Sequence, residues 1–319
     1  MSPLHVTRTL PEDATDAALR ADVLRGLTAT HKWLPPKWFY DARGSELFER
    51  ITELPEYYPT RAEREILAAR SGEIAAASGA RTLIELGSGS SEKTRYLLRA
   101  LPLAAYVPVD VSESALTRAG QALVADRPDL DVHALIADFT AALALPATPG
   151  PRLVAFLGGT IGNLLPAERA GFLASVRALL DPGDGLLLGT DLVKDAGVLV
   201  RAYDDAAGVT AAFNKNVLTV LDRELGADFD PEAFDHVALW DAEREWIEMR
   251  LRSRTAQTVK VPALGLAVDF AAGEDLRTEV SAKFRKETVA AELSAAGLDL
   301  THWWTDAQDR FALSLSVAR

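Results

Sequence analysis

Residues 82 to 95 read Thr-Leu-Ile-Glu-Leu-Gly-Ser-Gly-Ser-Ser-Glu-Lys-Thr-Arg. The apolar run from Thr82 to Leu86 is typical of a buried parallel strand. Gly87-Ser-Gly89 breaks this run, and the pattern from Glu92 to Leu101 predicts a helix. A strand, a glycine turn and a helix form the first unit of a doubly wound α/β domain, which binds its ligand at the carboxyl end of the strand. Glycines suit this turn because the backbone must bend tightly and let a ligand approach.

The residues around the glycines argue against two nucleotide-binding motifs. A dinucleotide fingerprint has a third glycine five positions after the first, but that position holds Glu92, whose side chain would repel a pyrophosphate. A Walker loop needs Gly-Lys-Ser or Gly-Lys-Thr, which does not follow at the right distance. Glu85-x-Gly87-x-Gly89 instead resembles the first motif of the S-adenosylmethionine-dependent methyltransferases, whose cofactor carries a sulfonium cation and no phosphate. A turn in some other α/β enzyme remains the alternative.

The composition narrows the classes of ligand and partner. The 319 residues suggest about two domains, and 34 basic against 46 acidic residues give a net charge of −12. This charge argues against nucleic acid or an anionic membrane and favours a small molecule. There is no cysteine, and the five histidines are scattered without metal-ligand spacing, so no metal is expected. With no signal-peptide pattern and no membrane-spanning run, we expect a cytoplasmic enzyme. We also expect it to act as a monomer.

The α/β pattern continues beyond the first strand. Further strands, each followed by or ending in a polar or glycine residue, are predicted at 106–109, 132–137, 153–157 and 186–190. Helices are predicted at 14–28, in a short segment capped by Ser45, at 61–77 and at 166–180. Because the carboxyl ends of parallel strands share one edge of a sheet, their end residues are expected to line a single crevice.

Several residues at these strand ends have specific expected roles. Asp110 lies 23 residues after Gly87, where an acidic residue of a doubly wound fold accepts the ribose hydroxyls. Asp138-Phe139 would place a carboxylate and an aromatic ring beside the adenine. Lys93 is either a solvent-exposed lysine or a partner of the cofactor's methionine carboxylate. Asn163 is either a substrate ligand or a polar helix cap.

After Asp191 the pattern changes. Residues 196–225 are predicted to be helical, and antiparallel strands are predicted at 236–242, 246–256 and 257–270. Because helical crossovers are missing, these strands cannot continue the parallel sheet and are expected to form an inserted second domain. A helix at 286–296 and a hairpin of 298–305 with 310–317 are predicted to close the first sheet.

Seven sequence segments spread over nearly the whole chain resemble those of the histidine-specific S-adenosylmethionine-dependent methyltransferases. These are the histidine Nα-methyltransferases of ergothioneine biosynthesis. The segments are Pro35-Pro-Lys-Trp-Phe-Tyr-Asp41, Leu54-Pro-Glu-Tyr-Tyr-Pro-Thr60, Glu85-Leu-Gly-Ser-Gly-Ser-Ser-Glu-Lys-Thr94, Gly159-Thr-Ile-Gly-Asn163, Gly189-Thr-Asp-Leu-Val-Lys194, Arg201-Ala-Tyr-Asp-Asp205 and Thr278-Glu-Val-Ser-Ala-Lys-Phe284. Only the segment around Leu101 to Tyr106 matches poorly. That family uses S-adenosylmethionine to methylate the α-amino nitrogen of L-histidine three times, which gives hercynine.

The resemblance implies the fold and the domains. We expect an α/β chain in which a class I (Rossmann-like) methyltransferase sheet carries an inserted second α+β substrate domain. The cofactor domain is expected at 61–195 plus 285–319, and the substrate domain at 14–60 plus 196–284.

The resemblance also implies the site residues. The cofactor would be held by Tyr40, Gly87, Ser88, Lys93, Asp110, Asp138 and Phe139. The histidine pocket would be lined by Tyr57, Asn163, Tyr203, Met249, Glu279 and Ser281. Tyr40 and Asn163 are the candidate catalytic residues, which would orient the amine lone pair and accept its protons through water; no general base is assigned. Taken alone, Tyr203 and Met249 are more typical of a hydrophobic core than of a ligand site.

The positions of Glu279 and Ser281 add an argument from the residues themselves. Two positions apart on an extended strand, they face the same way, and a carboxylate beside a hydroxyl suits the two ring nitrogens of an imidazole. The expected function is therefore trimethylation of the α-amino group of L-histidine with S-adenosylmethionine as methyl donor. The alternatives are a methyltransferase for another amino acid or a peptide N-terminus, and a non-catalytic cofactor-binding regulatory module.

Overall fold

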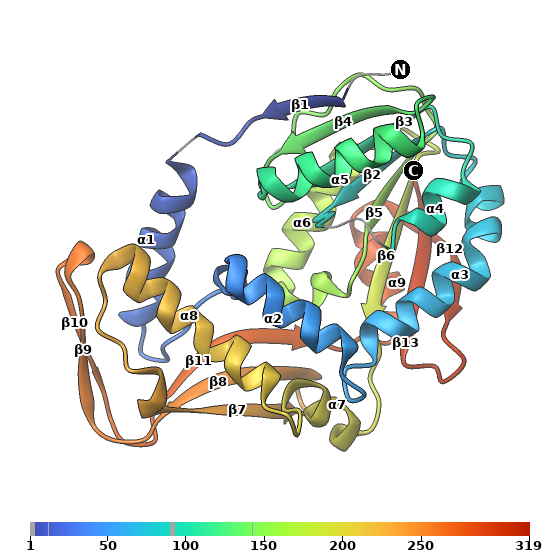
Figure 1. The fold of residues 1–319 in the computed structure, drawn as a ribbon. Helices are drawn as coiled ribbons and strands as arrows, with labels where there is room; N and C mark the ends of the chain where they lie inside the picture. Colours follow the sequence, from blue (N-terminus) through green and yellow to red (C-terminus); the bar gives the residue numbers. More distant parts are fainter. Residues whose placement is uncertain (1–3, 12, 90–92, 142) are drawn as a thin grey trace. The chain divides into compact units, whose positions relative to one another are not determined.

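The computed structural model describes residues 4–11, 13–89, 93–141 and 143–319, which form two compact units (Figure 1). Unit 1 comprises Met1–Pro11, Pro59–Leu192 and Phe284–Arg319, and unit 2 comprises Glu12–Tyr58 and Val193–Lys283. The predicted start of a helix at Glu92, and the use of Glu92 against a dinucleotide motif, lie outside the described residues.

Unit 1 is built around one large sheet with helices packed on it. Its strands are β1 (Leu4–Arg8), β2 (Thr82–Leu86), β3 (Ala105–Asp110), β4 (Asp131–Ile136), β5 (Arg152–Phe156), β6 (Gly185–Asp191), β12 (Leu298–Thr305) and β13 (Phe311–Ala318). Its helices are α3 (Pro59–Ser78), α4 (Arg95–Ala100), α5 (Glu113–Asp126), the 3₁₀ turn η2 (Thr160–Asn163), α6 (Pro166–Ala178) and α9 (Lys286–Ala295).

The strand order of this sheet is β1-β4-β3-β2-β5-β6-β13-β12. All neighbours from β1 to β6 are parallel, whereas β13 runs antiparallel to both β6 and β12. The predicted Rossmann-like sheet with an antiparallel closing hairpin is therefore confirmed. Strand β1 was not predicted; its short run pairs in parallel with β4, which places the start of the chain in unit 1.

The parallel strands form because their side chains are apolar on both faces of the sheet. All five residues of β2 are buried, and the core of unit 1 takes Leu83, Tyr106, Val132, Leu153 and Leu187 from five successive strands. Helix α5 runs along β3 and β4 (Figure 1). The chain proceeds from β2 to β3 and β4 on one side and then returns to β5 and β6 on the other. The junction of β2 and β5 is thus the topological switch point, where such sheets bind their ligands.

Unit 2 combines helices with two antiparallel sheets. Its helices are α1 (Ala14–Leu27), α2 (Ala42–Glu53), α7 (Ala196–Tyr203) and α8 (Val209–Leu225), with 3₁₀ turns η1 (Pro36–Phe39), η3 (Pro231–Ala233) and η4 (Pro262–Leu264). Its strands are β7 (Phe234–Asp241), β8 (Trp246–Ser253), β9 (Gln257–Val261), β10 (Leu266–Phe270) and β11 (Asp275–Ala282). Strand β8 lies between β7 and β11, and β9 pairs with β10.

Three predictions about unit 2 were wrong in detail. The predicted helix 196–225 is two helices, because the Asp205 carboxylate caps the second by accepting hydrogen bonds from the N–H groups of Val209 and Thr210. The segment 257–270 is a hairpin of β9 and β10 rather than one strand. Helix α2 starts before Ser45, since the side chain of Asp41 accepts a hydrogen bond from the N–H of Gly44 at 2.7 Å.

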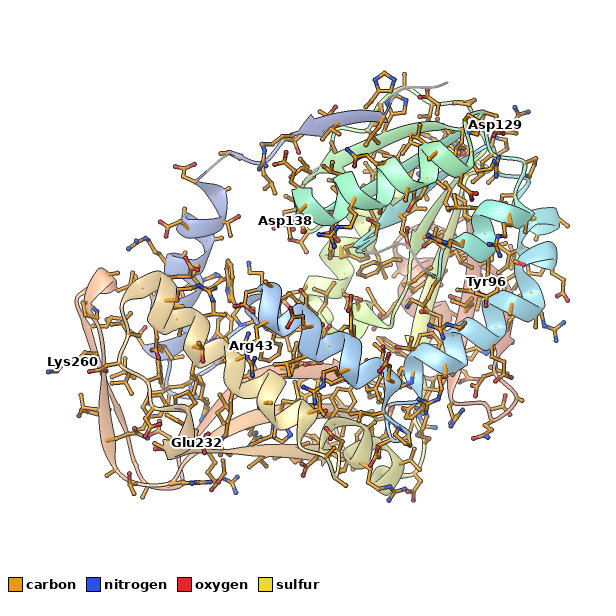
Figure 2. The ribbon with its side chains drawn as sticks, in the orientation of Figure 1. Arg43, Tyr96, Asp129, Asp138, Glu232 and Lys260 are labelled. Atoms are coloured by element: carbon orange, nitrogen blue, oxygen red, sulfur yellow. The ribbon has the colours of Figure 1, made fainter. Side chains whose placement is uncertain are left out.

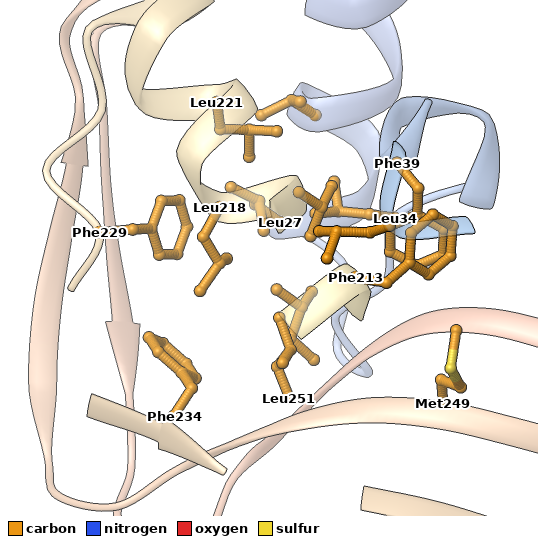
Figure 3. Packing of buried hydrophobic residues seen from close by; sticks show 14 of the residues in the cluster. Leu27, Leu34, Phe39, Phe213, Leu218, Leu221, Phe229, Phe234, Met249 and Leu251 are labelled. Atoms are coloured by element: carbon orange, nitrogen blue, oxygen red, sulfur yellow. The ribbon is translucent and has the colours of Figure 1, made fainter. Parts of the chain in front are cut away.

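The core of unit 2 joins its helices to the three-stranded sheet. Figure 3 shows the rings of Phe39 and Phe213 next to each other, with centroids 4.7 Å apart. Met249 and Leu251 extend from β8 into the same cluster. Thus α8 connects the proline-rich segment near Phe39 with the strand that carries Met249.

Candidate active site

The glycine turn after β2 has the conformation that its sequence predicts. Gly87 and Gly89 have positive φ angles of 69° and 50°, which side chains rarely tolerate. The N–H of Gly87 donates to the carbonyl of Val109 at 2.8 Å, and the N–H of Gly89 donates to Oδ2 of Asp110 at 3.0 Å. The turn is therefore tied to the end of β3.

Asp110 and Asp138 stand at the carboxyl ends of β3 and β4. Besides Gly89, Asp110 accepts a hydrogen bond from the N–H of Ser112 at 2.9 Å. Oδ1 of Asp138 accepts from the N–H of Thr140 at 2.8 Å and from its hydroxyl at 2.6 Å. Figure 2 shows Asp138 beside one end of β4 and Asp129 beside the opposite end. A carboxylate has about four acceptor positions, so both can still take a ribose hydroxyl or an adenine amino group.

Phe139 and Ser88 complete the surroundings of the turn. A Cβ added at Gly87 would lie 3.4 Å from the Phe139 ring, which also packs against Phe156 with centroids 5.3 Å apart. The Ser88 hydroxyl is buried, and within the described chain it has no hydrogen-bond partner. A buried hydroxyl without a partner is costly, so it indicates a place for a polar ligand atom. Strand-end carboxylates, a neighbouring ring and this hydroxyl fit S-adenosylmethionine.

Lys93 is held by Glu63, a residue that was not predicted from the sequence. Its ammonium forms an ion pair with Glu63 of α3, and the other carboxylate oxygen of Glu63 accepts from the N–H of Gly158 at 2.7 Å. The signal for Glu63 was available, because it lies between Ala62 and Ile66 on the buried face of a helix. A carboxylate on such a face must have partners.

A second buried carboxylate, Glu85, lies at the end of β2. It accepts hydrogen bonds from the hydroxyls of Thr94 and Tyr106. Desolvation raises the pKa of Glu85 to about 7, although these two bonds and the charge of Lys93 act in the opposite direction. The acidic residue of the glycine motif therefore titrates near neutrality.

Asn163 belongs to unit 1, in the turn η2 that follows β5. Two glycines with positive φ, Gly158 and Gly159, allow the chain to turn there. Among the predicted pocket residues Asn163 therefore lies with the cofactor group, whereas Tyr40, predicted to contact the cofactor, belongs to unit 2.

Unit 2 brings three of the predicted tyrosines into one series of aromatic contacts. The ring of Tyr40 meets that of Phe48 edge to face at 5.5 Å, and Phe48 meets Tyr57 at 6.1 Å. Tyr57 in turn meets Tyr203 at 6.3 Å. Tyr203 at the end of α7 thus meets rings from the segment 40–57, from which it is remote in the sequence.

Tyr203 and Ser281 share a buried lysine that the sequence reading also missed. The hydroxyls of Tyr203 and Ser281 are 2.7 Å apart, and the ammonium of Lys283 donates to them at 2.9 Å and 2.8 Å. Glu279 lies two residues before Ser281 on β11, and both pair regularly with β8, so they share a face. Met249, opposite Glu279, is 1% exposed and is a core residue in this structure.

The pKa of the Tyr40 phenol is raised, first by desolvation, then by the charge of Glu279 and by Tyr203. A phenol with a raised pKa stays protonated at neutral pH. Tyr40 is therefore suited to hydrogen bonding rather than to acting as an ionised base.

A buried hydrogen-bond network ends at the backbone carbonyl of Tyr203. Thr278 donates to Oδ1 of Asn214 at 2.5 Å, and Nδ2 of Asn214 donates to Nδ1 of His236 at 2.9 Å. Nε2 of His236 then donates to the carbonyl of Tyr203 at 2.8 Å. Desolvation lowers the pKa of His236, so its ring is neutral, as this pattern of one donor and one acceptor requires. The sequence offered no pattern linking these residues.

Two histidines that are remote in sequence meet at the edge of the sheet in unit 1. His5 and His133 are paired in register between β1 and β4, and their rings stack at 4.7 Å. The ligand atoms of these two and of Asp131 lie within 4.8 Å of one another. His5 and His133, which are scattered in the sequence, are therefore neighbours in the structure. This was missed because β1 was not predicted.

Within the described part of the chain, no helix is long and apolar enough to cross a membrane.

Comparisons with known proteins show which proteins this chain is similar to. The chain is 60% identical over 318 residues to the histidine N-alpha-methyltransferase of Mycolicibacterium smegmatis, covering 98% of this chain and 99% of that protein. It is 56% identical over 318 residues to the histidine N-alpha-methyltransferase of Mycobacterium tuberculosis, with the same coverage. An S-adenosylmethionine-dependent methyltransferase from Clostridium acetobutylicum has a similar fold, with a TM-score of 0.50 at 11% identity, covering 86% of this chain and 98% of that chain.

The family model described as histidine-specific, SAM-dependent methyltransferase matches residues 19–318. This range includes all candidate site residues of both units. The match extends over the glycine turn, the strand-end carboxylates and the Glu279–Ser281 strand alike. The chain therefore belongs to the family of histidine-specific, S-adenosylmethionine-dependent methyltransferases.

Proposed function

We propose that this protein transfers methyl groups from S-adenosylmethionine to the α-amino nitrogen of L-histidine, three times in succession, to give hercynine, a step of ergothioneine biosynthesis. The observation that carries the proposal is the match of the whole chain to histidine N-alpha-methyltransferases at 56% and 60% identity. Each transfer forms an N–C bond, breaks the S–C bond of the cofactor and releases one proton. S-adenosylhomocysteine is the other product of each transfer.

The cofactor is assigned to the carboxyl edge of the sheet in unit 1. When bound, it supplies an electrophilic methyl group on its sulfonium. Asp110 would accept the ribose hydroxyls, and Asp138 with Phe139 would hold the adenine. Gly87 and Ser88 would line the turn, and Lys93 would pair with the α-carboxylate. Tyr40 of unit 2 is also assigned to the cofactor, on the family resemblance.

The histidine substrate is assigned mainly to residues of unit 2. Glu279 would accept the imidazole N–H, and the Ser281 hydroxyl would bind the other ring nitrogen. Tyr57, Tyr203 and Asn163 would bind the amino-acid end. Met249 packs in the core of unit 2 and would contribute to the pocket wall from there. Support comes from the positions of Glu279 and Ser281 on one face of β11. We assign the protein to the cytoplasm as a monomer; its net charge of −12 disfavours self-association.

Methyl transfer is an in-line displacement, so alignment matters more than a strong base. The amine must lose its proton before each attack, and near neutrality a minor fraction of free histidine has done so. Tyr40, held protonated, and Asn163 would orient the lone pair and pass protons to water by hydrogen bonding. No residue needs to act as a general base in this scheme.

Mass spectrometry of histidine incubated with enzyme and S-adenosylmethionine tests the proposal. The expected result is the appearance of one, two and finally three added methyl groups. A peptide with an internal histidine, whose α-amino group is blocked, serves as the matched control and should not react. Methylation of other amino acids or of peptide N-termini at comparable rates would replace histidine as the substrate. No consumption of cofactor with any amine would favour the regulatory module instead.

A further inference from the structure

Glu63 is a carboxylate placed on the apolar face of α3. It is 0% exposed, and its helical neighbours Ala62, Ile66 and Leu67 are buried as well. A buried carboxylate is strongly unfavourable unless its charge and its lone pairs have partners. The partners of Glu63 therefore indicate what it does.

These partners come from two different strand-to-helix turns. One carboxylate oxygen accepts from the ammonium of Lys93, which follows β2, and the other accepts from the N–H of Gly158, which follows β5, at 2.7 Å. Strands β2 and β5 are direct neighbours in the sheet. Glu63 thus connects the two turns that flank the topological switch point, the place where doubly wound sheets bind ligands.

The backbone around Glu63 leaves room for this arrangement. A Cβ added at Gly189 of β6 would lie 2.5 Å from Oε1 of Glu63, so any larger residue would displace the carboxylate. A Cβ added at Gly158 would lie 3.5 Å from the Lys93 ammonium, so the second turn passes directly over it. Gly189 therefore leaves the space that the carboxylate occupies. At Gly158 the second turn comes into contact with the ammonium.

The other buried carboxylate nearby has a different set of partners. Glu85 accepts from the hydroxyls of Thr94 and Tyr106, whereas the direct ion pair of Lys93 is with Glu63. The Lys93 side chain remains 25% exposed. An ammonium has three donor hydrogens, so one can bind Glu63 while another is directed to a ligand.

We propose that Glu63 is a positioning residue of the cofactor site, which holds the Lys93 ammonium at the switch point in the orientation that binds the α-carboxylate of S-adenosylmethionine. The inference rests on the assignment of Lys93 under the proposed function. Glu63 itself does not touch the cofactor; it acts through Lys93.

Binding of two ligands to E63Q tests this role by calorimetry. S-adenosylhomocysteine contains the α-carboxylate, whereas 5′-methylthioadenosine keeps the adenosine and lacks the amino-acid part. E63Q retains the size and an acceptor for Gly158 but loses the charge. We expect about tenfold weaker binding of S-adenosylhomocysteine and less than twofold weaker binding of 5′-methylthioadenosine. Equal weakening of both ligands would mean a general structural role, and unchanged binding of both would also overturn the proposal.

A double variant checks that Glu63 acts through Lys93. K93M should reproduce the selective loss, and adding E63Q to K93M should change S-adenosylhomocysteine binding by less than twofold. A further tenfold loss in the double variant would contradict the proposal. If E63Q does not fold, E63D can be used, since it keeps the charge on a shorter side chain. E63D should weaken S-adenosylhomocysteine binding less than tenfold and 5′-methylthioadenosine binding less still. Equal losses for both ligands would overturn the proposal.

Asp184 offers a matched control in the same unit. It is also a buried carboxylate that accepts from a backbone N–H and a cation, here both from Arg152 at 2.7 Å, but it lies at the amino end of the strands. D184N should lower the unfolding temperature without selectivity between the two ligands. Histidine methylation by the wild-type enzyme is measured in parallel. If that reaction fails while the selective effect of E63Q persists, the proposed substrate is wrong and the role of Glu63 stands.

Discussion

The candidate sites of the two units differ in the kind of interaction that holds their residues in place. In unit 1 the main chain holds the carboxylates at the strand ends. Asp110 accepts hydrogen bonds from the N–H groups of Gly89 and Ser112, and Asp138 accepts one from the N–H of Thr140. In unit 2 the contacts run from side chain to side chain, through aromatic rings and through the hydroxyls of Tyr203 and Ser281 around Lys283.

This difference matches what each unit is proposed to bind. Main-chain geometry depends little on individual side chains, which suits a cofactor that many enzymes share. A site made of side-chain contacts changes with each substitution, which suits recognition of one substrate. We therefore expect substitutions in unit 1 to affect the cofactor or folding, and substitutions in unit 2 to affect histidine.

The largest expected effect concerns Glu85 and pH. Its pKa rises from 4.5 unfolded to about 7 folded, so the folded state binds more protons between these values and stability falls as pH rises through this window. The loss amounts to about 3 kcal/mol and is complete above pH 7. E85Q should remove this part of the pH dependence. Urea unfolding of both proteins at pH 5 and pH 8 measures it, and parallel pH dependences would show that Glu85 is not the cause.

The next effect separates the cofactor unit from the substrate unit. D110A should weaken S-adenosylmethionine binding by about 1.5 to 3 kcal/mol, the range for hydrogen bonds to a charged group. Calorimetry on the folded variant provides the measurement. D129A, at the other end of β4 and exposed, is the control and should bind the cofactor normally. An unchanged affinity for D110A would remove Asp110 from the site.

Glu279 tests the substrate side of the comparison. E279A should lower kcat/KM for histidine about tenfold or more, roughly 1.4 kcal/mol of transition-state stabilisation, because a charge-assisted bond to the imidazole is lost. E279Q should fall between wild type and E279A. Cofactor affinity in the same variants should hardly change. A parallel loss of cofactor binding would make Glu279 structural, and no loss of either would place the imidazole elsewhere.

The smallest expected effect concerns Thr278, in the hydrogen-bond network that reaches the backbone of Tyr203. T278V removes the hydroxyl that donates to Asn214 and leaves a buried amide oxygen without that donor. The free energy of unfolding should fall by about 1 kcal/mol. Histidine binding should weaken as well, because the network reaches the backbone of Tyr203 through His236. Calorimetry of T278V with histidine and with S-adenosylmethionine measures both affinities. An equal fall in the two affinities would contradict a role of this network in histidine binding.

The sequence alone determined the parallel sheet and the positions at its carboxyl edge. Apolar runs, glycine turns and residues at strand ends are local patterns, so Gly87, Asp110 and Asp138 were predicted together from their spacing, and the family resemblance extended the prediction to Tyr203, Glu279 and Ser281. The break between α7 and α8 was missed because the Asp205 cap lies within a stretch that otherwise favours a helix.

Only the tertiary structure decided which side chains act on these positions from elsewhere in the chain. Glu63 reaches Lys93 across 30 residues, and Lys283 reaches Tyr203 across 80. Such partners have no fixed spacing, because they are set by how a helix packs on a sheet or how a strand pairs with its neighbour. Burial then sets their energetics: the same carboxylate that is ordinary in a loop becomes costly inside the protein, and only the fold shows which cation or hydroxyl compensates it.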